Sequence, residues 1–554
     1  MNRIERFVKR NINTIFAVFG CVVVVATQCV TFVSLDKNLI PSDEGWYLCL
    51  LRDIPQFGIT RFHLLFHNVF GNNIYAIRLC NWLLQFFGAF FLAFGIGRFV
   101  LRHLLSQECS VQSWQVYLLS VGIIFCGQMN LVACPSLNYL TLNKAFAEFG
   151  MGFLLLGLSQ EKWIYYVCSG WAMAHLFPIM ITNVIIIPVM CVVIGLLSSS
   201  KKKHLLCFIV GILFFVAYYL TFVEKPQSVF AFLLKETTQT VRRGGNDYGI
   251  AFLLKWSIRV VYYMCRCLLI ATLLYAQYYI IRYKLRINRT WKIILFVCST
   301  IILLGYLLKY VPPYVPSHQY GTLIWAKDIL WILVFVDIIE ALVNRKCIDK
   351  QRFVMGGCLL FMPIALSFGT NVPFYIRQGS YLLFVLPVLL FFPKNMSFYK
   401  KIVLLLVLIG QFVLFVHSWK GENWHGEKWF GYKEPVSSIG INQKVELDTV
   451  YIEKLDFCRQ MVPKGRIMCD MENWGVVCLL DYIPVTYEFD ITRLDMRSIQ
   501  SIVNDAVNQD GELWIVCNRY SLNFIEKIYH LHGYKVEKYT HNNDLYFHLT
   551  IDNT

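Results

Sequence analysis

Apolar stretches long enough to cross a bilayer recur along the first 417 residues of this 554-residue chain. A transmembrane helix needs roughly 20 mostly apolar residues, and about thirteen such stretches can be placed. We expect spans near residues 14–35, 77–97, 113–129, 140–158, 163–179, 181–198, 204–222, 256–281, 291–310, 323–343, 353–370, 379–393 and 401–417. The chain is therefore predicted to be an α-helical polytopic membrane protein.

The composition agrees with a membrane protein and argues against nucleic acid as a partner. Hydrophobic residues make up 57% of the chain and charged residues 16%, which is more apolar than an ordinary soluble protein. The net charge is +16, but the basic residues are scattered between the apolar runs and form no continuous stripe. Membrane lipids are the expected surroundings.

The distribution of Lys and Arg predicts the orientation, because these residues concentrate in short cytoplasmic loops. The short loops near 129–139, 179–181 and 311–322 contain no Lys or Arg. If the N-terminus is cytoplasmic, the basic clusters all fall inside, namely Arg3 to Arg10, Arg98 and Arg102, Lys162, Lys201 to Lys203, Arg282 to Lys292, Arg345 to Arg352, and Lys394 to Lys401. We expect a bacterial inner membrane, a first span that is retained as an anchor, and a C-terminal domain outside.

Two modules are predicted. Residues 1–417 form the transmembrane module, with long outer loops at 36–76 and 223–255, and residues 418–554 form a small extracytoplasmic domain. In this domain, strand-like runs at 466–471, 476–482, 512–517 and 545–549 alternate with helical patterns at 493–507 and 522–530, which is typical of an α/β fold. Its cysteines, Cys458, Cys469, Cys478 and Cys517, leave a disulfide and free buried thiols as alternatives.

The start of the first outer loop carries two adjacent carboxylates. Asp43 and Glu44 follow the first span directly, at the level where a lipid-borne phosphate would lie. A hydroxyl that attacks a sugar needs a base, and a carboxylate can supply it. The alternative is that both residues stabilise the first turn of a surface helix.

After this pair, the N-terminal 100 residues resemble the GT-C class of membrane glycosyltransferases, which includes protein O-mannosyltransferases and lipid A aminoarabinose transferases. The resemblance rests on an acidic pair and a Tyr in the first outer loop, a Gly-containing segment, and an Arg that opens the second span. The matching residues, in order, are Asp43, Glu44, Tyr47, Gly58, Gly71 and Arg78. Beyond these residues the resemblance is only architectural.

The resemblance implies a GT-C-like fold and an inverting transfer of a sugar from a polyprenyl-phosphate donor to a lipid, glycan or protein acceptor. Asp43 would be the catalytic base, with Glu44 assisting it, and Tyr47 and Arg78 would contribute to donor binding. No cofactor is firmly expected, and a divalent cation (Mg²⁺ or Mn²⁺) stays open as an alternative. No metal ligands are assigned.

Further candidates for binding the donor phosphate lie in the later outer segments. Arginine binds phosphate oxygens bidentately, which points to Arg242, Arg243 and Arg377. The alternative for these residues is attraction to lipid headgroups. His318 lies in a proline-rich outer loop, where a structural role is the alternative.

Asn138 and Tyr139 open the fourth predicted span at the same outer level. Lys144 and Glu148 follow in this span with a spacing of four residues, so they are expected either to pair with each other or to serve function.

Two other classes of function stay open. One is a transporter or flippase of lipid-linked glycans, although no repeated halves are visible in the sequence. The other is a polymerase or ligase of surface glycans. The acidic pair after the first span and the folded C-terminal domain favour the glycosyltransferase.

Overall fold

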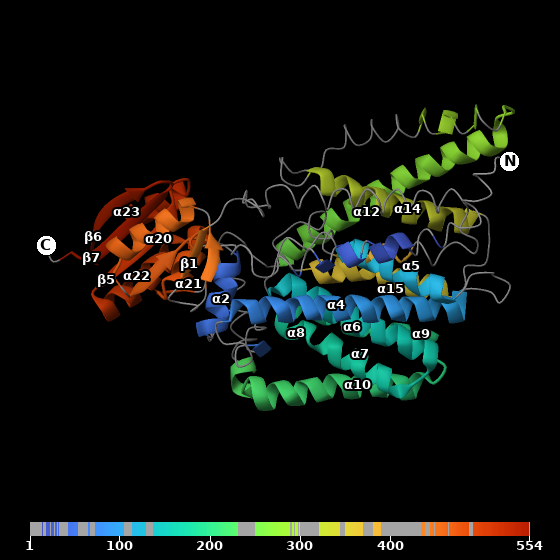
Figure 1. Cartoon of the computed structure of the whole chain (residues 1–554), viewed down its shortest axis with the longest axis horizontal. Helices are drawn as coiled ribbons and strands as arrows, with labels where there is room; N and C mark the ends of the chain where they lie inside the picture. The colour runs from blue at the N-terminus through green and yellow to red at the C-terminus, as the bar shows by residue number, and fades with distance from the viewer. Residues whose placement is uncertain are drawn as a thin grey trace.

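The computed structural model describes most of the chain. The described residues are 43–53, 73–104, 113–128, 137–230, 250–288, 321–343, 350–368, 381–388, 434–437, 444–447, 449–463, 465–486 and 491–552, with isolated positions between 14 and 32, at 65–66 and between 291 and 299. Figure 1 shows a long helical bundle with a small α/β domain at one end.

One helix of the described residues lies at the end of the bundle, and helices of different lengths make up the rest of it. This helix is α2 (Asp43–Asp53), which lies beside the C-terminal domain (Figure 1). The other helices are α4 (Ile74–Phe99) with its π-helical end η1 (Val100–Leu104), α5 (Ser113–Gln128), α6 (Tyr139–Gln160), α7 (Trp163–Ala174), α8 (Leu176–Ile179), η3 (Ile181–Ile185), α9 (Ile186–Leu197), α10 (Lys201–Tyr218), η4 (Tyr219–Val223), α12 (Ile250–Tyr279), η5 (Ile280–Lys284), α14 (Gly321–Val343), α15 (Lys350–Ser367) and α17 (Leu382–Val385).

Three helical stretches among the described residues are long and apolar enough to cross a membrane. They are Ile74–Leu104, Lys201–Val223 and Leu254–Tyr279, and they match the predicted spans at 77–97, 204–222 and 256–281. Two further apolar helices, Ser113–Phe125 and Thr182–Leu197, are shorter. The described part of the chain is therefore compatible with a membrane protein, but it does not show the expected number of about thirteen spans.

Four other predicted spans depart from this pattern or lie outside the described residues. Helix α6 is 22 residues long but contains Lys144 and Glu148, which lower its hydropathy. The stretches at 163–179 and 181–198 are both interrupted, the first at His175 between α7 and α8 and the second where the 3-10 turn η3 precedes α9. Residues 401–417 lie outside the described residues.

Helices α4 and α6 pack with their backbones in contact. A Cβ atom on Gly95 would lie 2.6 Å from the carbonyl oxygen of Gly152, and a Cβ on Gly152 would lie 2.7 Å from the backbone of Phe91. Small residues allow such a close approach between membrane helices, where van der Waals packing replaces the hydrophobic effect. This contact fixes how the polar residues on the two helices face each other.

The end of the bundle remote from the C-terminal domain is rich in basic residues. Arg102 donates a hydrogen bond to the carbonyl of Ser159 and lies 3.7 Å from the carboxylate of Glu161. Arg352, at the start of α15, donates to the carbonyl of Leu104. The C-terminal end of α4, the end of α6 and the start of α15 therefore meet at one end of the bundle.

The C-terminal domain contains a five-stranded sheet in the order β4-β3-β5-β7-β6. Strands β3 (Arg466–Cys469), β4 (Ile483–Pro484) and β5 (Glu512–Asn518) are parallel, whereas β7 (Asp544–Ile551) is antiparallel to both β5 and β6 (Tyr534–His541). A separate antiparallel pair consists of β1 (Glu434–Ser437) and β2 (Lys444–Leu447). The sequence thus correctly predicted an α/β fold here.

Helices cover both faces of this sheet. Residues of α20 (Thr449–Met461) and α21 (Trp474–Leu479) pack on one face, where Trp514, Val516 and Tyr546 point. Residues of α22 (Met496–Asp510) and α23 (Leu522–Tyr529) pack on the other face, beside η7 (Ile491–Arg493). The first of these cores is continuous with the core of the bundle.

One predicted strand is wrong. The run at 476–482 forms helix α21 and only then the short strand β4. A short apolar run does not by itself distinguish a buried helix from a buried strand. Here all six residues of α21 are buried, because the helix is enclosed between the sheet and α2.

Candidate functional site

The helix that begins with the acidic pair is held between the bundle and the C-terminal domain. A Cβ atom on Gly45 of α2 would lie 2.6 Å from the backbone nitrogen of Gly475 in α21, so the two helices touch backbone to backbone. Leu48, Leu50 and Leu51 of α2 are buried. This part of the predicted first outer loop is therefore packed into the protein.

A polar contact fixes the C-terminal end of the same helix. One guanidinium nitrogen of Arg52 lies 3.3 Å from the carboxylate of Asp481, and the other donates a 2.9 Å hydrogen bond to the carbonyl of Tyr482. Both contacts reach the turn after α21, so the C-terminal domain holds this end of α2.

The other side of α2 contacts the bundle through aromatic rings. The ring of Tyr47 is 6.4 Å from that of Tyr139, the first residue of α6, and 4.9 Å from that of Trp46. Asn138 caps α6, since its side-chain oxygen accepts hydrogen bonds from the backbone nitrogens of Leu140 and Thr141, both at 2.9 Å. Tyr47, which the sequence suggested in the first outer loop, therefore lies beside the pair of Asn138 and Tyr139, which it suggested at the start of the fourth predicted span.

Asp43 and Glu44 occupy the first turn of α2. Asp43 precedes Tyr47 by four residues, so the two positions share one face of the helix. Carboxylates in a first turn also interact favourably with the helix dipole, and this structural interpretation of the pair stands beside the catalytic one.

A row of polar residues extends from this end of the bundle along α4. Arg78 and Asn81 are each 3% exposed, and Gln85 follows one turn later. Their spacing places all three on one face, and Gln85 donates a hydrogen bond to the carbonyl of Thr141 in α6. The sequence analysis identified Arg78 but missed Asn81 and Gln85, although the i, i+3, i+7 spacing of polar residues in an apolar helix was a signal for them.

Further polar groups are buried deeper in α6. Lys144 and Glu148 are 1% and 0% exposed, and the two charges attract each other. Asn143 accepts a 2.7 Å hydrogen bond from the side-chain nitrogen of Asn183, which lies in the 3-10 turn before α9. Buried polar groups of this kind inside an apolar helical bundle are costly, so they mark positions of functional interest.

Four predicted site residues lie outside the described residues: Arg242, Arg243, His318 and Arg377. Among the residues that are described, no three His, Cys, Asp or Glu side chains come together as a group of metal ligands.

The four cysteines of the C-terminal domain are buried and free. Burial raises the pKa of the Cys458 thiol to about 11, and the pKa of Cys469 is also raised well above its ordinary value by burial. Of the two alternatives that the sequence left open, the structure shows buried thiols, which are poor nucleophiles at neutral pH.

Comparison with known protein families and with curated proteins finds no match to this chain. The assignment of function therefore depends on the residues themselves and on the resemblance of the N-terminal segment.

Proposed function

We propose that the protein is a GT-C-type glycosyltransferase that transfers a sugar from a polyprenyl-phosphate donor to a lipid, glycan or protein acceptor. The reaction would take place on the outer face of a bacterial inner membrane, at the end of the bundle where α2 lies. The acidic pair of α2 would be its catalytic centre.

The observation that carries this proposal is the position of α2. The helix that begins with Asp43 and Glu44 is fixed by Gly475 and Asp481 on one side and by Tyr139 on the other. A reacting group must be held to within fractions of an ångström, and support by surrounding packing is how proteins achieve this. A segment that served only to connect two spans would not need such contacts.

The distribution of basic residues supports an outer location for α2. Arg102 and Arg352 lie at the opposite end of the bundle, which the positive-inside rule assigns to the cytoplasm. On this basis α2 and the C-terminal domain would both lie outside. The number of spans in the full bundle, about thirteen in our interpretation, is part of the same proposal.

In the proposed reaction, an acceptor hydroxyl attacks the anomeric carbon of the sugar from the side opposite the phosphate. The new carbon–oxygen bond forms as the bond to the phosphate oxygen breaks, so the configuration is inverted and polyprenyl phosphate leaves. Asp43 accepts the hydroxyl proton, with Glu44 assisting it. Arg78, at the outer end of α4, would stabilise the departing phosphate, together with Arg242, Arg243 and Arg377 of the later outer segments.

The test is sugar transfer from radiolabelled polyprenyl-phosphate sugars in native membranes, with wild-type protein and the Asp43→Asn variant. Loss of a general base lowers the rate by about 100-fold or more, so we expect transfer to fall by at least this factor. Donor binding should change much less, because Asn keeps the size of Asp.

The matched control is Asp53→Asn, which makes the same change at the other end of α2. It should leave transfer close to the wild-type rate. If Asp43→Asn is as active as Asp53→Asn, Asp43 is not the base, and if wild-type protein transfers no sugar from any donor, the glycosyltransferase proposal is wrong.

A transporter of lipid-linked glycans is the second candidate. Its support is the set of buried polar residues inside the bundle, Asn143, Lys144, Glu148 and Asn183, because transporters place such groups near the bilayer midplane. Purified protein in liposomes would then move a fluorescent polyprenyl-linked sugar between leaflets without breaking the glycosidic bond.

A further inference from the structure

The C-terminal domain has a polar site of its own at the carboxyl ends of its parallel strands. Strands β3 and β5 are neighbours, but the chain leaves β3 through α21 toward β4 and leaves β5 through α23 toward β6. The two connections therefore diverge. In open α/β sheets, ligands bind beyond the carboxyl ends of the strands at such a point.

Asp470 lies at this point, directly after β3, and its carboxylate is held by three donors. It accepts hydrogen bonds from the backbone nitrogen of Asn518 at 2.6 Å, the side-chain nitrogen of Asn473 at 2.7 Å and the backbone nitrogen of Glu472 at 3.2 Å. Asn518 is the last residue of β5, and its side chain donates a 2.6 Å hydrogen bond to Glu472. The loops after β3 and β5 are thus joined by polar contacts.

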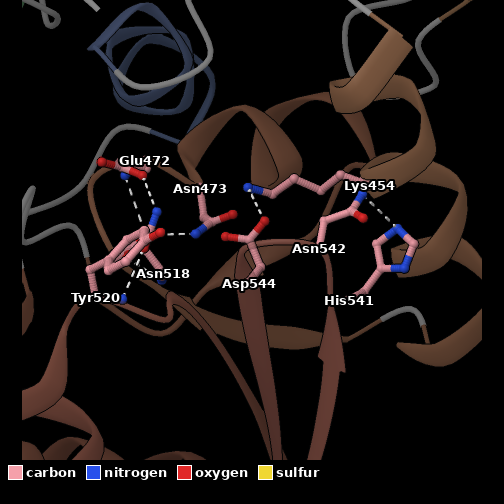
Figure 2. Close-up of polar contacts among 9 residues, drawn as sticks. Lys454, Glu472, Asn473, Asn518, Tyr520, His541, Asn542 and Asp544 are labelled. Carbon is pink, nitrogen blue, oxygen red and sulfur yellow. Dashed lines mark hydrogen bonds and ion pairs between the residues drawn. The ribbon is translucent and has the colours of Figure 1, made fainter.

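Asn473 supplies an independent sign of a ligand. Its side chain is completely buried, and within the described part of the chain its amide oxygen has no hydrogen-bond partner. Its amide nitrogen is committed to Asp470, so the oxygen must point the other way. Figure 2 shows this oxygen directed toward the pair formed by Lys454 of α20 and Asp544 at the start of β7.

The Lys454–Asp544 pair is itself nearly buried. The ammonium and the carboxylate are 2.8 Å apart, and the two side chains are 10% and 9% exposed. An ammonium group has three N–H donors and a carboxylate has about four acceptor positions, so one contact between them leaves hydrogen-bonding capacity on both.

The mixture of groups selects the kind of ligand. A metal cation would be repelled by the ammonium of Lys454, and a phosphate would be repelled by Asp470 and Asp544. A ligand with several neutral hydroxyl groups fits better, because each hydroxyl both donates to a carboxylate or amide oxygen and accepts from an ammonium. Saccharides have this arrangement of hydroxyl groups.

Tyr520 adds an exposed aromatic surface beside these groups. Its side chain is 70% exposed, and its backbone nitrogen donates a 3.0 Å hydrogen bond to the side-chain oxygen of Asn518 (Figure 2). Arg519 holds the ring, since its guanidinium lies 4.8 Å from the ring centre and donates a 2.6 Å hydrogen bond to the hydroxyl. An aromatic face of this kind can pack on the apolar face of a sugar ring.

The site is next to the helix that carries the acidic pair. Asn473 is followed by Trp474 and by Gly475, which touches Gly45 of α2. We infer that the carboxyl edge of β3 and β5 binds saccharide units of a glycan acceptor and so presents the acceptor to α2. The role of the bound saccharide as an acceptor rests on the proposed glycosyltransferase function, whereas saccharide binding itself does not.

The experiment is saturation-transfer NMR on full-length protein in nanodiscs. The probes are four trisaccharides, built from glucose, galactose, mannose and N-acetylglucosamine. We expect at least one to bind wild-type protein. Asn473→Leu should weaken that binding about tenfold, because it removes one hydrogen bond to the saccharide, and the free energy of such a bond corresponds to about a tenfold change in affinity.

Tyr520→Ala keeps the inference testable if Asn473→Leu does not fold, because an exposed side chain is not needed for packing. It should weaken binding several-fold. Its matched control is Tyr529→Ala, which removes a 52% exposed tyrosine from α23 on the other face of the sheet and should leave binding unchanged.

This experiment distinguishes a failure of the saccharide site from a failure of the proposed glycosyltransferase function. Binding is measured without donor and so does not depend on sugar transfer, and binding without any sugar transfer would support the saccharide site while contradicting the proposed function. The inference is overturned if none of the trisaccharides binds wild-type protein, or if Tyr520→Ala and every folded Asn473 variant bind as tightly as Tyr529→Ala.

Discussion

Arg52 and Asp481 form an ion pair with 3.3 Å between their charged groups, although 429 positions separate them in the sequence. The pair joins α2, at the end of the bundle, to the C-terminal domain. The side chain of Arg52 is 13% exposed and that of Asp481 is 44% exposed, so solvent screens the charge of Asp481 more than that of Arg52.

We predict that Arg52→Ala destabilises the protein by about 1 to 3 kcal/mol, because it removes a charged hydrogen bond to the carbonyl of Tyr482 as well as the ion pair. Asp481→Asn should cost less than about 1 kcal/mol, since it loses only a solvent-screened attraction. Asn also tolerates the positive φ of 60° at this position. Thermal unfolding in detergent measures the loss of stability in both variants. Equal losses would mean that the hydrogen bond from Arg52 to Tyr482 adds nothing to the ion pair.

The second prediction concerns the close contact between Gly45 and Gly475. Gly45→Ala places a Cβ atom 2.6 Å from the backbone nitrogen of Gly475, so α2 must move away from α21. Overpacking of this kind costs about 1 to 3 kcal/mol. Sugar transfer should fall with it, because the acidic pair moves with the helix.

The control is Gly195→Ala in α9, where a Cβ atom would meet nothing within 4 Å. This change should be neutral or stabilising by up to about 1 kcal/mol, because alanine has a higher helix propensity than glycine. If both variants have the same melting temperature, the close packing of α2 on α21 is not important for stability.

The third prediction concerns the pH dependence of stability that arises from Asp470. Burial raises the pKa of its carboxyl from 3.8 to about 6, against the opposing effect of its hydrogen bonds to Asn518 and Asn473. The folded state therefore holds this proton more tightly than the unfolded state. Its contribution to stability is fully present below about pH 4 and is lost as the pH rises through about 6, by roughly 3 kcal/mol in all.

The check is thermal unfolding between pH 4 and pH 7 for wild-type protein and for Asp470→Asn. Other carboxyl groups also titrate, so the informative quantity is the difference between the two proteins at each pH. We expect that difference to change across the window from pH 4 to pH 6 in the direction that favours the wild type at low pH. A difference that is constant with pH would show that Asp470 has an ordinary pKa.

The sequence predicted those parts of the fold that depend on local pattern. The spans around α4, α10 and α12 have long apolar runs with few charges, and β5 and β7 have strong strand patterns, so all five were recognised. Helix α21 was not, because its apolar residues owe their burial to contacts with α2 more than 400 residues earlier in the sequence. Local periodicity contains no information about such a contact.

The same distinction applies to the sites. Tyr47 was identified through the family resemblance, and Asn138 and Tyr139 from their place at the start of the fourth predicted span, but only the folded chain places the rings of Tyr47 and Tyr139 together. The residues around Asp470 were missed, since they come from α20, two loops and the start of β7. The proposed roles of Arg242, Arg243, His318 and Arg377 stay predictions.

A last prediction concerns a buried ion pair between α12 and α14. Arg266 lies 3.4 Å from the carboxylate of Asp328, which also accepts a hydrogen bond from the hydroxyl of Tyr263. Asp328 is 3% exposed and lies in an apolar helix. Asp328→Leu should destabilise the protein by about 3 to 5 kcal/mol, because it leaves the charge of Arg266 buried without its counter-ion.

The double variant Arg266→Met and Asp328→Leu tests the reason for that loss. If the cost arises from an uncompensated charge, removing both charges should restore much of the stability, so the two single effects will not add. Thermal unfolding of the four proteins in one detergent gives the coupling energy, which we expect to be about 1 to 3 kcal/mol. Additive effects would mean that Asp328 stabilises the bundle through Tyr263 and packing, and that the ion pair contributes nothing to the association of α12 with α14.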